Sequence, residues 1–139
     1  MKQLLKNRFS DLYALYLRLN YRLMQEFKYA GLSNYEIFSK IYKNKIWGEG
    51  EFNSGDGSRR DKLVIPYIEF LRTFLSECKC DKTLVDLGCG NFYVGEQIVS
   101  NCSNYIACDV VSELIEYNKI KFTYENLKFV TCDIVNDEL

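Results

Sequence analysis

The fold of this chain is decided by residues 83–95, which read TLVDLGCGNFYVG. Residues 83–87 form a short apolar run with β-branched side chains, and such a run predicts a buried strand. Gly88 and Gly90 interrupt it, because glycine allows a sharp turn and a close approach of a ligand to the backbone. Residues 92–99 then predict a helix, whose first N–H groups we expect to be free for an anionic group. A strand, a glycine turn and a helix form the first unit of a nucleotide-binding α/β fold.

The spacing of these glycines separates two classes of nucleotide site. The dinucleotide fingerprint G-x-G-x-x-G needs a third glycine three residues after the second, where this chain has Tyr93. Asp86 instead precedes the glycines, so that residues 86–90 follow the pattern Asp-x-Gly-x-Gly. This pattern resembles the first motif of class I S-adenosylmethionine-dependent methyltransferases. The resemblance implies that Asp86 and the segment Gly88-Cys89-Gly90 bind the aminocarboxypropyl end of the cofactor S-adenosyl-L-methionine.

Two further strands are predicted downstream, over residues 104–109 and 127–133, and each ends in a carboxylate. Ligands of open parallel sheets bind outside the carboxyl ends of the strands, so Asp86, Asp109 and Asp133 are expected to converge there. Asp109 lies 23 positions after Asp86, near the spacing of an acidic ribose ligand. The alternative is that these aspartates only cap helices or close turns, as we expect Ser112 to do for the helix that follows the second strand.

The carboxylates at the strand ends are expected to contact different parts of an adenosine group. A carboxylate such as Asp109 can accept two hydrogen bonds from vicinal ribose hydroxyls. Asp133 would accept one from the adenine amino group, and Val110 and Ile134 would flank the ring. The motif resemblance extends over residues 83–139, with 107–109 as the family's second motif and 131–133 as its third.

Upstream of this region the chain predicts helices and one loop. Residues 1–30 predict an amphipathic helix that packs on its own domain or on a second copy. A capping box at Ser33 and Glu36 predicts a second short helix. Residues 46–59 contain four glycines and form a loop, which either only connects or covers the cofactor with Ser54 and Ser58. The segments around Trp47 and Ser54 resemble a methyltransferase subgroup with a serine-glycine segment in the cofactor pocket, which points to a small-molecule or sugar-linked acceptor.

A longer helix is predicted over residues 61–78, with Pro66 near its start. Its apolar side is expected to comprise Val64, Ile65, Ile68, Leu71, Phe74 and Leu75. We therefore divide the chain into a helical N-terminal extension with the glycine-rich loop, residues 1–60, and a partial Rossmann-like domain, residues 61–139. The fold class is α/β, with a partial parallel sheet of three strands preceded by N-terminal helices.

Composition restricts the partners of this 139-residue chain. Its formal net charge is −1, so no global basic field favours nucleic acid or a membrane surface. No apolar run approaches the roughly 20 residues of a membrane helix, and the N-terminus lacks the apolar core of a secretory signal. We therefore expect a cytoplasmic protein with a small-molecule substrate. The six cysteines are expected to be reduced and to bind no metal, and the absence of histidine excludes a Ser–His or Cys–His pair within this chain.

The family resemblance also implies that something is missing. The full family domain has further strands beside the first, so the order 3-2-1 leaves residues 83–87 as an exposed edge. We expect an N-terminal portion of a longer enzyme, truncated after the third strand, or a homodimer through the N-terminal helices or the sheet edge. The catalytic residues are unknown; Glu49, Glu51 and Asp56 are candidates by position only. The alternative is a non-catalytic module that binds an adenosine ligand or a protein. A third hypothesis, a nicotinamide-dependent oxidoreductase, is disfavoured because this chain lacks the third glycine of the dinucleotide fingerprint.

Overall fold

The computed structural model describes residues 15, 16, 18, 19, 28–58, 60–78, 81 and 83–137. The chain forms two compact units, residues 1–33 and residues 34–139. The prediction of a helix over residues 1–30 falls on the first unit, and most of that range lies outside the described residues. The second contains, in chain order, α2 (Asn34–Lys43), η1 (Asp56–Ser58), α3 (Asp61–Glu77), β1 (Thr83–Leu87), α4 (Tyr93–Ile98), η2 (Val99–Asn101), β2 (Asn104–Asp109), α5 (Ser112–Lys121) and β3 (Leu127–Thr131). The predicted loop and α2 therefore lie in the same unit as the sheet.

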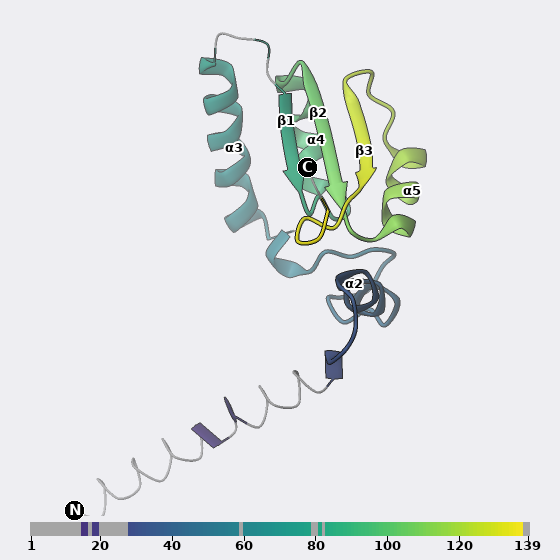
Figure 1. Cartoon of the computed structure of the whole chain (residues 1–139). Helices are drawn as coiled ribbons and strands as arrows, with labels where there is room; N and C mark the ends of the chain where they lie inside the picture. Colours follow the sequence, from purple (N-terminus) through teal and green to yellow (C-terminus); the bar gives the residue numbers. More distant parts are fainter. Residues whose placement is uncertain are drawn as a thin grey trace, which may run out of the picture. The chain divides into compact units, whose positions relative to one another are not determined.

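The three strands form one parallel sheet in the order β1-β2-β3. Thr83 pairs with Asn104 and Tyr105 pairs with Leu127, so the three strands run in register from their first residues. Figure 1 shows that all three arrowheads point toward the same edge of the sheet. The α/β fold class is thereby confirmed as a partial Rossmann-like arrangement, with β1 at the predicted edge.

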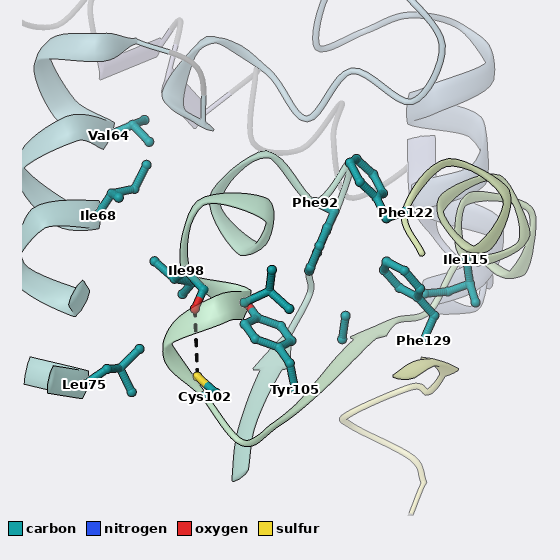
Figure 2. Close-up of a cluster of buried hydrophobic side chains, with 12 residues drawn as sticks. Val64, Ile68, Leu75, Phe92, Ile98, Cys102, Tyr105, Ile115, Phe122 and Phe129 are labelled. Atoms are coloured by element: carbon teal, nitrogen blue, oxygen red, sulfur yellow. Dashed lines mark hydrogen bonds between the residues drawn. The ribbon is translucent and has the colours of Figure 1, made fainter. Parts of the chain in front are cut away.

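Helices α3, α4 and α5 contribute to one core on one face of the sheet. The buried side chains come from α3, α4, α5 and the strands, and include Val64, Ile68, Leu75, Ile98, Tyr105, Ile115 and Phe129. Figure 2 shows Phe92 among these side chains. Its ring centroid lies 5.5, 5.1 and 5.0 Å from those of Tyr105, Phe122 and Phe129. This packing holds Phe92 in a left-handed conformation, φ 62°, at the start of α4.

The opposite face of β1 is open to solvent. Side chains alternate along a strand, so Leu84 packs on the core whereas Val85 and Leu87 face the other way and remain 48% and 46% exposed. Parallel sheets are normally covered on both faces. The described part of the chain thus covers this sheet on one face and leaves apolar surface on the other.

Two sequence predictions about helices need correction. Val64, Ile68 and Leu75 on α3 are buried, but Ile65 and Phe74 are exposed. Because α3 is apolar around more than one side, only the stripe toward the core is buried. Ser112 does not cap α5; Val111 occupies that position, and the Ser112 hydroxyl donates to Glu113 at 3.1 Å. No helix in the described residues is long and apolar enough to cross a membrane.

Candidate functional site

A cavity of about 570 Å³ opens at the carboxyl ends of the strands. Every cofactor-binding residue predicted from the sequence lines it: Ser54, Ser58, Asp86, Gly88, Cys89, Gly90, Asp109, Val110, Asp133 and Ile134. Ser54 comes from the loop before η1 and Ser58 from η1 itself, and the others come from the glycine turn and from the ends of the strands or just beyond them. The parallel topology brings them together, because strand ends that point the same way meet at one edge.

The glycine turn that precedes α4 is closed by its own hydrogen bonds. The N–H groups of Gly88 and Cys89 both donate to the Cys108 carbonyl at 2.8 Å. The Gly90 N–H donates to Asp109 Oδ2 at 3.1 Å, and the Asn91 N–H donates to Ser54 Oγ at 3.0 Å. The Phe92 N–H donates to the Cys89 carbonyl at 3.1 Å. Since these donors are satisfied within the chain, the turn has no row of N–H groups ready for a phosphate.

Gly90 lies at the tightest point of the turn. Its φ of +53° is a left-handed conformation, and a Cβ atom there would lie 2.5 Å from Ser54 Oγ. Gly88 also has a left-handed φ of +81°, but a Cβ atom on it would meet open space. Glycine is therefore required at position 88 by backbone conformation and at position 90 also by the serine packed against it.

Asp109 is 7% exposed and is held by backbone donors. Its Oδ2 accepts the Gly90 N–H at 3.1 Å and its Oδ1 accepts the Val111 N–H at 3.1 Å. Burial raises the pKa of Asp109, and these backbone hydrogen bonds oppose the rise. The Val110 N–H is a third backbone donor to this carboxylate, so its acceptor capacity is partly used within the chain.

Asp86 is a second, half-buried carboxylate of the cavity. The Tyr105 hydroxyl donates to its Oδ2 at 2.9 Å. Burial raises the pKa of Asp86, the Tyr105 hydrogen bond opposes this, and the charge of Asp109 adds to it. The pKa of the Cys89 thiol is also raised, first by burial and then by Asp109, so this cysteine remains a neutral thiol rather than a nucleophile.

Asp133 differs from the other two aspartates because its acceptor sites are occupied. It lies just beyond β3, and Asn34 Nδ2 donates to its two oxygens at 3.0 and 3.2 Å. The Val135 N–H donates to Oδ1 at 3.1 Å and Asn136 Nδ2 to Oδ2 at 2.8 Å. The hydrogen bonds from Asn136 and Asn34 lower the pKa of Asp133. In this structure Asp133 closes a turn and attaches α2 to it.

One wall of the cavity was not predicted as part of the site. Asn34, Phe38 and Tyr42 of α2 line it together with Trp47. The spacing of four residues along α2 places the first three on one helix face, which was a usable signal. The Trp47 ring lies 5.9 Å from Phe38 and 5.5 Å from Tyr42. Burial, followed by the charge of Asp109, raises the pKa of Tyr42 to about 12, so its hydroxyl is neutral at physiological pH.

The cavity lining is acidic and aromatic. Asp86, Asp109 and Asp133 are its charged members, and no lysine or arginine is found among the described lining residues. Of the bases suggested by position, Glu49 instead pairs with Lys45 at 2.6 Å and Glu51 lines a separate pocket, while the Asp56 side chain lies outside the described set. Within the described residues, His, Cys, Asp and Glu form no cluster suited to a metal ion.

Comparisons with known proteins add little to this site. No family model matches the chain, and no curated protein matches it. Among solved structures, a similar chain occurs in the complex between the Haloferax volcanii Trm112 methyltransferase activator and the protein described as the methyltransferase. The identity is 22% and the TM-score 0.37, and the match covers 56% of this chain and 36% of that chain. Because that likeness is too low to carry an argument about function, the site is interpreted from its own residues.

Proposed function

We propose that this chain binds S-adenosyl-L-methionine in the cavity and is the cofactor-binding portion of a methyltransferase. The observation that carries the proposal is the meeting of Asp86, the turn from Gly88 to Gly90 and Asp109 in one cavity at adjacent strand ends. When bound, S-adenosyl-L-methionine supplies a methyl group on a sulfonium centre. The described residues would contribute binding, orientation and exclusion of water.

Asp109 fits the role of ribose ligand. Its two oxygens are oriented by the N–H groups of Gly90 and Val111, and the Val110 N–H is a further backbone donor. Two oxygens of a fixed carboxylate match two vicinal hydroxyls, and hydrogen bonds to an ionised acceptor are stronger than neutral ones. The carboxylate is therefore oriented before a nucleoside arrives.

Asp86 fits a ligand with an ammonium group. Burial raises its pKa in the free chain, so its ionised form is disfavoured there. A cation within about 4–6 Å would favour the ionised carboxylate. The amino end of S-adenosyl-L-methionine carries such a charge, and binding should therefore strengthen as the pH rises through the pKa of Asp86.

Asp133, with Val110 and Ile134, remains the proposed adenine end of the site. All three line the cavity, but the acceptor sites of Asp133 are filled by Asn34, Val135 and Asn136. For Asp133 to accept from the adenine amino group, the Asn34 amide has to release it, because the other two donors belong to the turn itself. Asn34 is thus the donor that a ligand would replace.

The same geometry counts against a nicotinamide dinucleotide. A diphosphate needs several donors or cations, whereas the turn donors from Gly88 to Phe92 are used within the chain. The described lining supplies carboxylates instead of cations. A positively charged, phosphate-free nucleoside is the ligand that suits this lining.

The acceptor would enter on the aromatic side of the cavity. Trp47 and Tyr67 line it and are 37% and 53% exposed. Aromatic side chains with a polar end combine an apolar face with a hydrogen-bonding group, which suits a small molecule with both kinds of surface. A small or sugar-linked acceptor is the class we propose.

A thermal-shift titration tests the proposal. The chain is titrated with S-adenosylmethionine, S-adenosylhomocysteine and NAD, beside Asp109→Ala and the control Asp81→Ala, an exposed aspartate hydrogen-bonded to Ser103. A ligand at 100 times its dissociation constant adds about 2.7 kcal/mol of stability. We expect this with the two adenosyl ligands for wild type and Asp81→Ala, and its loss in Asp109→Ala.

Stabilisation by NAD without a response to the adenosyl ligands would contradict the proposal. Binding of the adenosyl ligands without methyl transfer to any acceptor tried would instead favour the alternative, a non-catalytic module that binds an adenosine ligand.

A further inference from the structure

We infer that Asn118 of α5 is a positioning residue that holds the glycine turn in its ligand-binding shape. The inference rests on the proposed function, which supplies the ligand. The contacts that support it are those of Asn118 and Gly90, which the proposed function does not use. Asn118 does not line the cavity, so it would act through Gly90 rather than by touching the ligand.

Asn118 is a buried amide whose nitrogen makes one hydrogen bond and whose oxygen makes none. It is 0% exposed. Its Nδ2 donates to the Gly90 carbonyl at 2.8 Å, and its Oδ1 has no partner. Burying an unsatisfied acceptor is unfavourable, and an apolar side chain of similar shape would avoid that cost. Core packing alone therefore does not account for an amide at this position, whereas the hydrogen bond to Gly90 does.

Gly90 is fixed from both of its peptide groups. Its N–H donates to Asp109 Oδ2 at 3.1 Å and its carbonyl accepts from Asn118. Ser54 Oγ occupies a third side, where a Cβ atom would approach within 2.5 Å. The backbone of Gly90 is thereby held between the end of β2, the middle of α5 and the loop before η1.

This arrangement links Asn118 to the proposed ribose ligand. The Oδ2 atom of Asp109 is oriented by the Gly90 N–H, which belongs to the peptide group before Gly90. Asn118 holds the peptide group after it, through the Gly90 carbonyl, to which the Cys89 thiol also donates at 3.8 Å. Because both peptide groups rotate about the same glycine Cα, fixing the second one restricts the first. Without Asn118, the buried carbonyl loses its amide donor and the turn can rotate toward another partner. Asp109 would then lose the donor that orients it toward the two ribose hydroxyls.

The chain provides a matched control for this residue. Asn126 also donates through its Nδ2 to backbone carbonyls, those of Val99 and Cys102, at 2.9 and 2.8 Å. It precedes β3, at the end of the sheet opposite the cavity. Asn126→Leu therefore removes the same chemistry from the fold without touching the glycine turn.

The test measures S-adenosylhomocysteine affinity by calorimetry for the full chain, Asn118→Leu and Asn126→Leu. Loss of one oriented, buried hydrogen bond should weaken binding about tenfold in Asn118→Leu. Asn126→Leu should lower the melting temperature and leave the affinity within about twofold. Equal affinity of Asn118→Leu and wild type would overturn the inference.

Amide hydrogen exchange separates this inference from the proposed function. Gly90 and Asn91 should exchange about tenfold faster in Asn118→Leu than in Asn126→Leu, with Ala107 in the centre of the sheet as reference. Unchanged exchange at both amides would overturn the inference whether or not a ligand binds. If Asn118→Leu does not fold, hydrogen exchange of the Asn118 side-chain amide is measured in the wild type. Rapid exchange of these protons would refute the hydrogen bond to Gly90 and with it the inference. Wild-type chain that binds no adenosyl ligand would refute the proposed function alone.

Discussion

Asp86 is a residue whose charge opposes the stability of the free chain and would be favoured by a cationic ligand. Its half-buried carboxylate is raised in pKa by burial and by the charge of Asp109, and the Tyr105 hydroxyl, which donates to it, opposes the rise. Ionisation of Asp86 is therefore less favourable in the free chain than that of an exposed aspartate. A cationic ligand would remove that penalty, which is the pattern expected of a binding residue rather than of a structural one.

We predict that Asp86→Asn is more stable than the wild type at neutral pH and binds S-adenosylmethionine more weakly. The folded pKa of Asp86 is raised above its ordinary value of 3.8. Over the pH range above that value the folded chain holds the proton more tightly than the unfolded chain, so wild-type stability falls as the pH rises. Asparagine can keep the Tyr105 hydrogen bond and cannot ionise.

Thermal melts of both proteins from acidic to neutral pH check this prediction. The advantage of Asp86→Asn should be present at neutral pH and vanish once the pH falls below the ordinary aspartate pKa. A difference in melting temperature that does not depend on pH would argue that burial of the Asp86 charge is not its cause.

Helix α2 contributes a hydrogen bond that affects which ligands the site can bind. Asn34, its first residue, donates to Asp133 across a separation of 99 residues. This contact attaches the wall formed by Asn34, Phe38 and Tyr42 to the turn after β3. The same carboxylate cannot serve both Asn34 and an adenine amino group, because its acceptor sites are filled.

We therefore predict that Asn34→Ala binds S-adenosylhomocysteine more tightly than the wild type does. The competing amide is removed and two acceptor sites on Asp133 become free for the adenine amino group. S-inosylhomocysteine, which lacks that amino group, should not gain affinity. Calorimetric titration of both ligands makes the comparison. An equal change for the two ligands, or none, would show that Asp133 does not contact the adenine amino group.

The predicted and observed elements agree where local patterning is strong. The first two strands and helix α3 are predicted from periodicity and turn residues, and their observed ends lie within one residue of the predicted ones. Helix α2 is predicted without bounds and is observed over Asn34–Lys43. Ile65 and Phe74 were placed on the buried side of α3 incorrectly, because periodicity alone cannot choose between two apolar stripes on one helix. That choice depends on which stripe faces the core.

At the level of the whole molecule, the open face of the sheet is the most prominent property. Val85 and Leu87 are about half exposed on an edge strand, and edge strands with apolar side chains favour association with another chain. A homodimer at the β1 edge would cover them if its contacts extend onto this face. The other predicted dimer interface, through the N-terminal helices, involves mainly residues that the structure does not describe.

We predict that the double variant Val85→Thr with Leu87→Thr self-associates less than the wild type. Threonine keeps strand propensity and replaces apolar surface by hydroxyls. Sedimentation velocity at increasing concentration makes the measurement. Ile120→Thr is the control, because Ile120 is 85% exposed on α5 and away from the sheet. An equal effect of both variants would assign any association to general hydrophobicity instead of to this face.

The sequence by itself determined the strand, glycine turn and helix unit and the set of aspartates at successive strand ends. Local patterning specifies these elements, and parallel pairing then requires that their carboxyl ends meet. Only the tertiary structure decided which polar groups remain available. The closed turn, the occupied Asp133 and the hydrogen bond from Asn118 to Gly90 join residues that are far apart in the chain. A sequence pattern lists donors and acceptors, but their pairing across such separations depends on how the helices and loops pack.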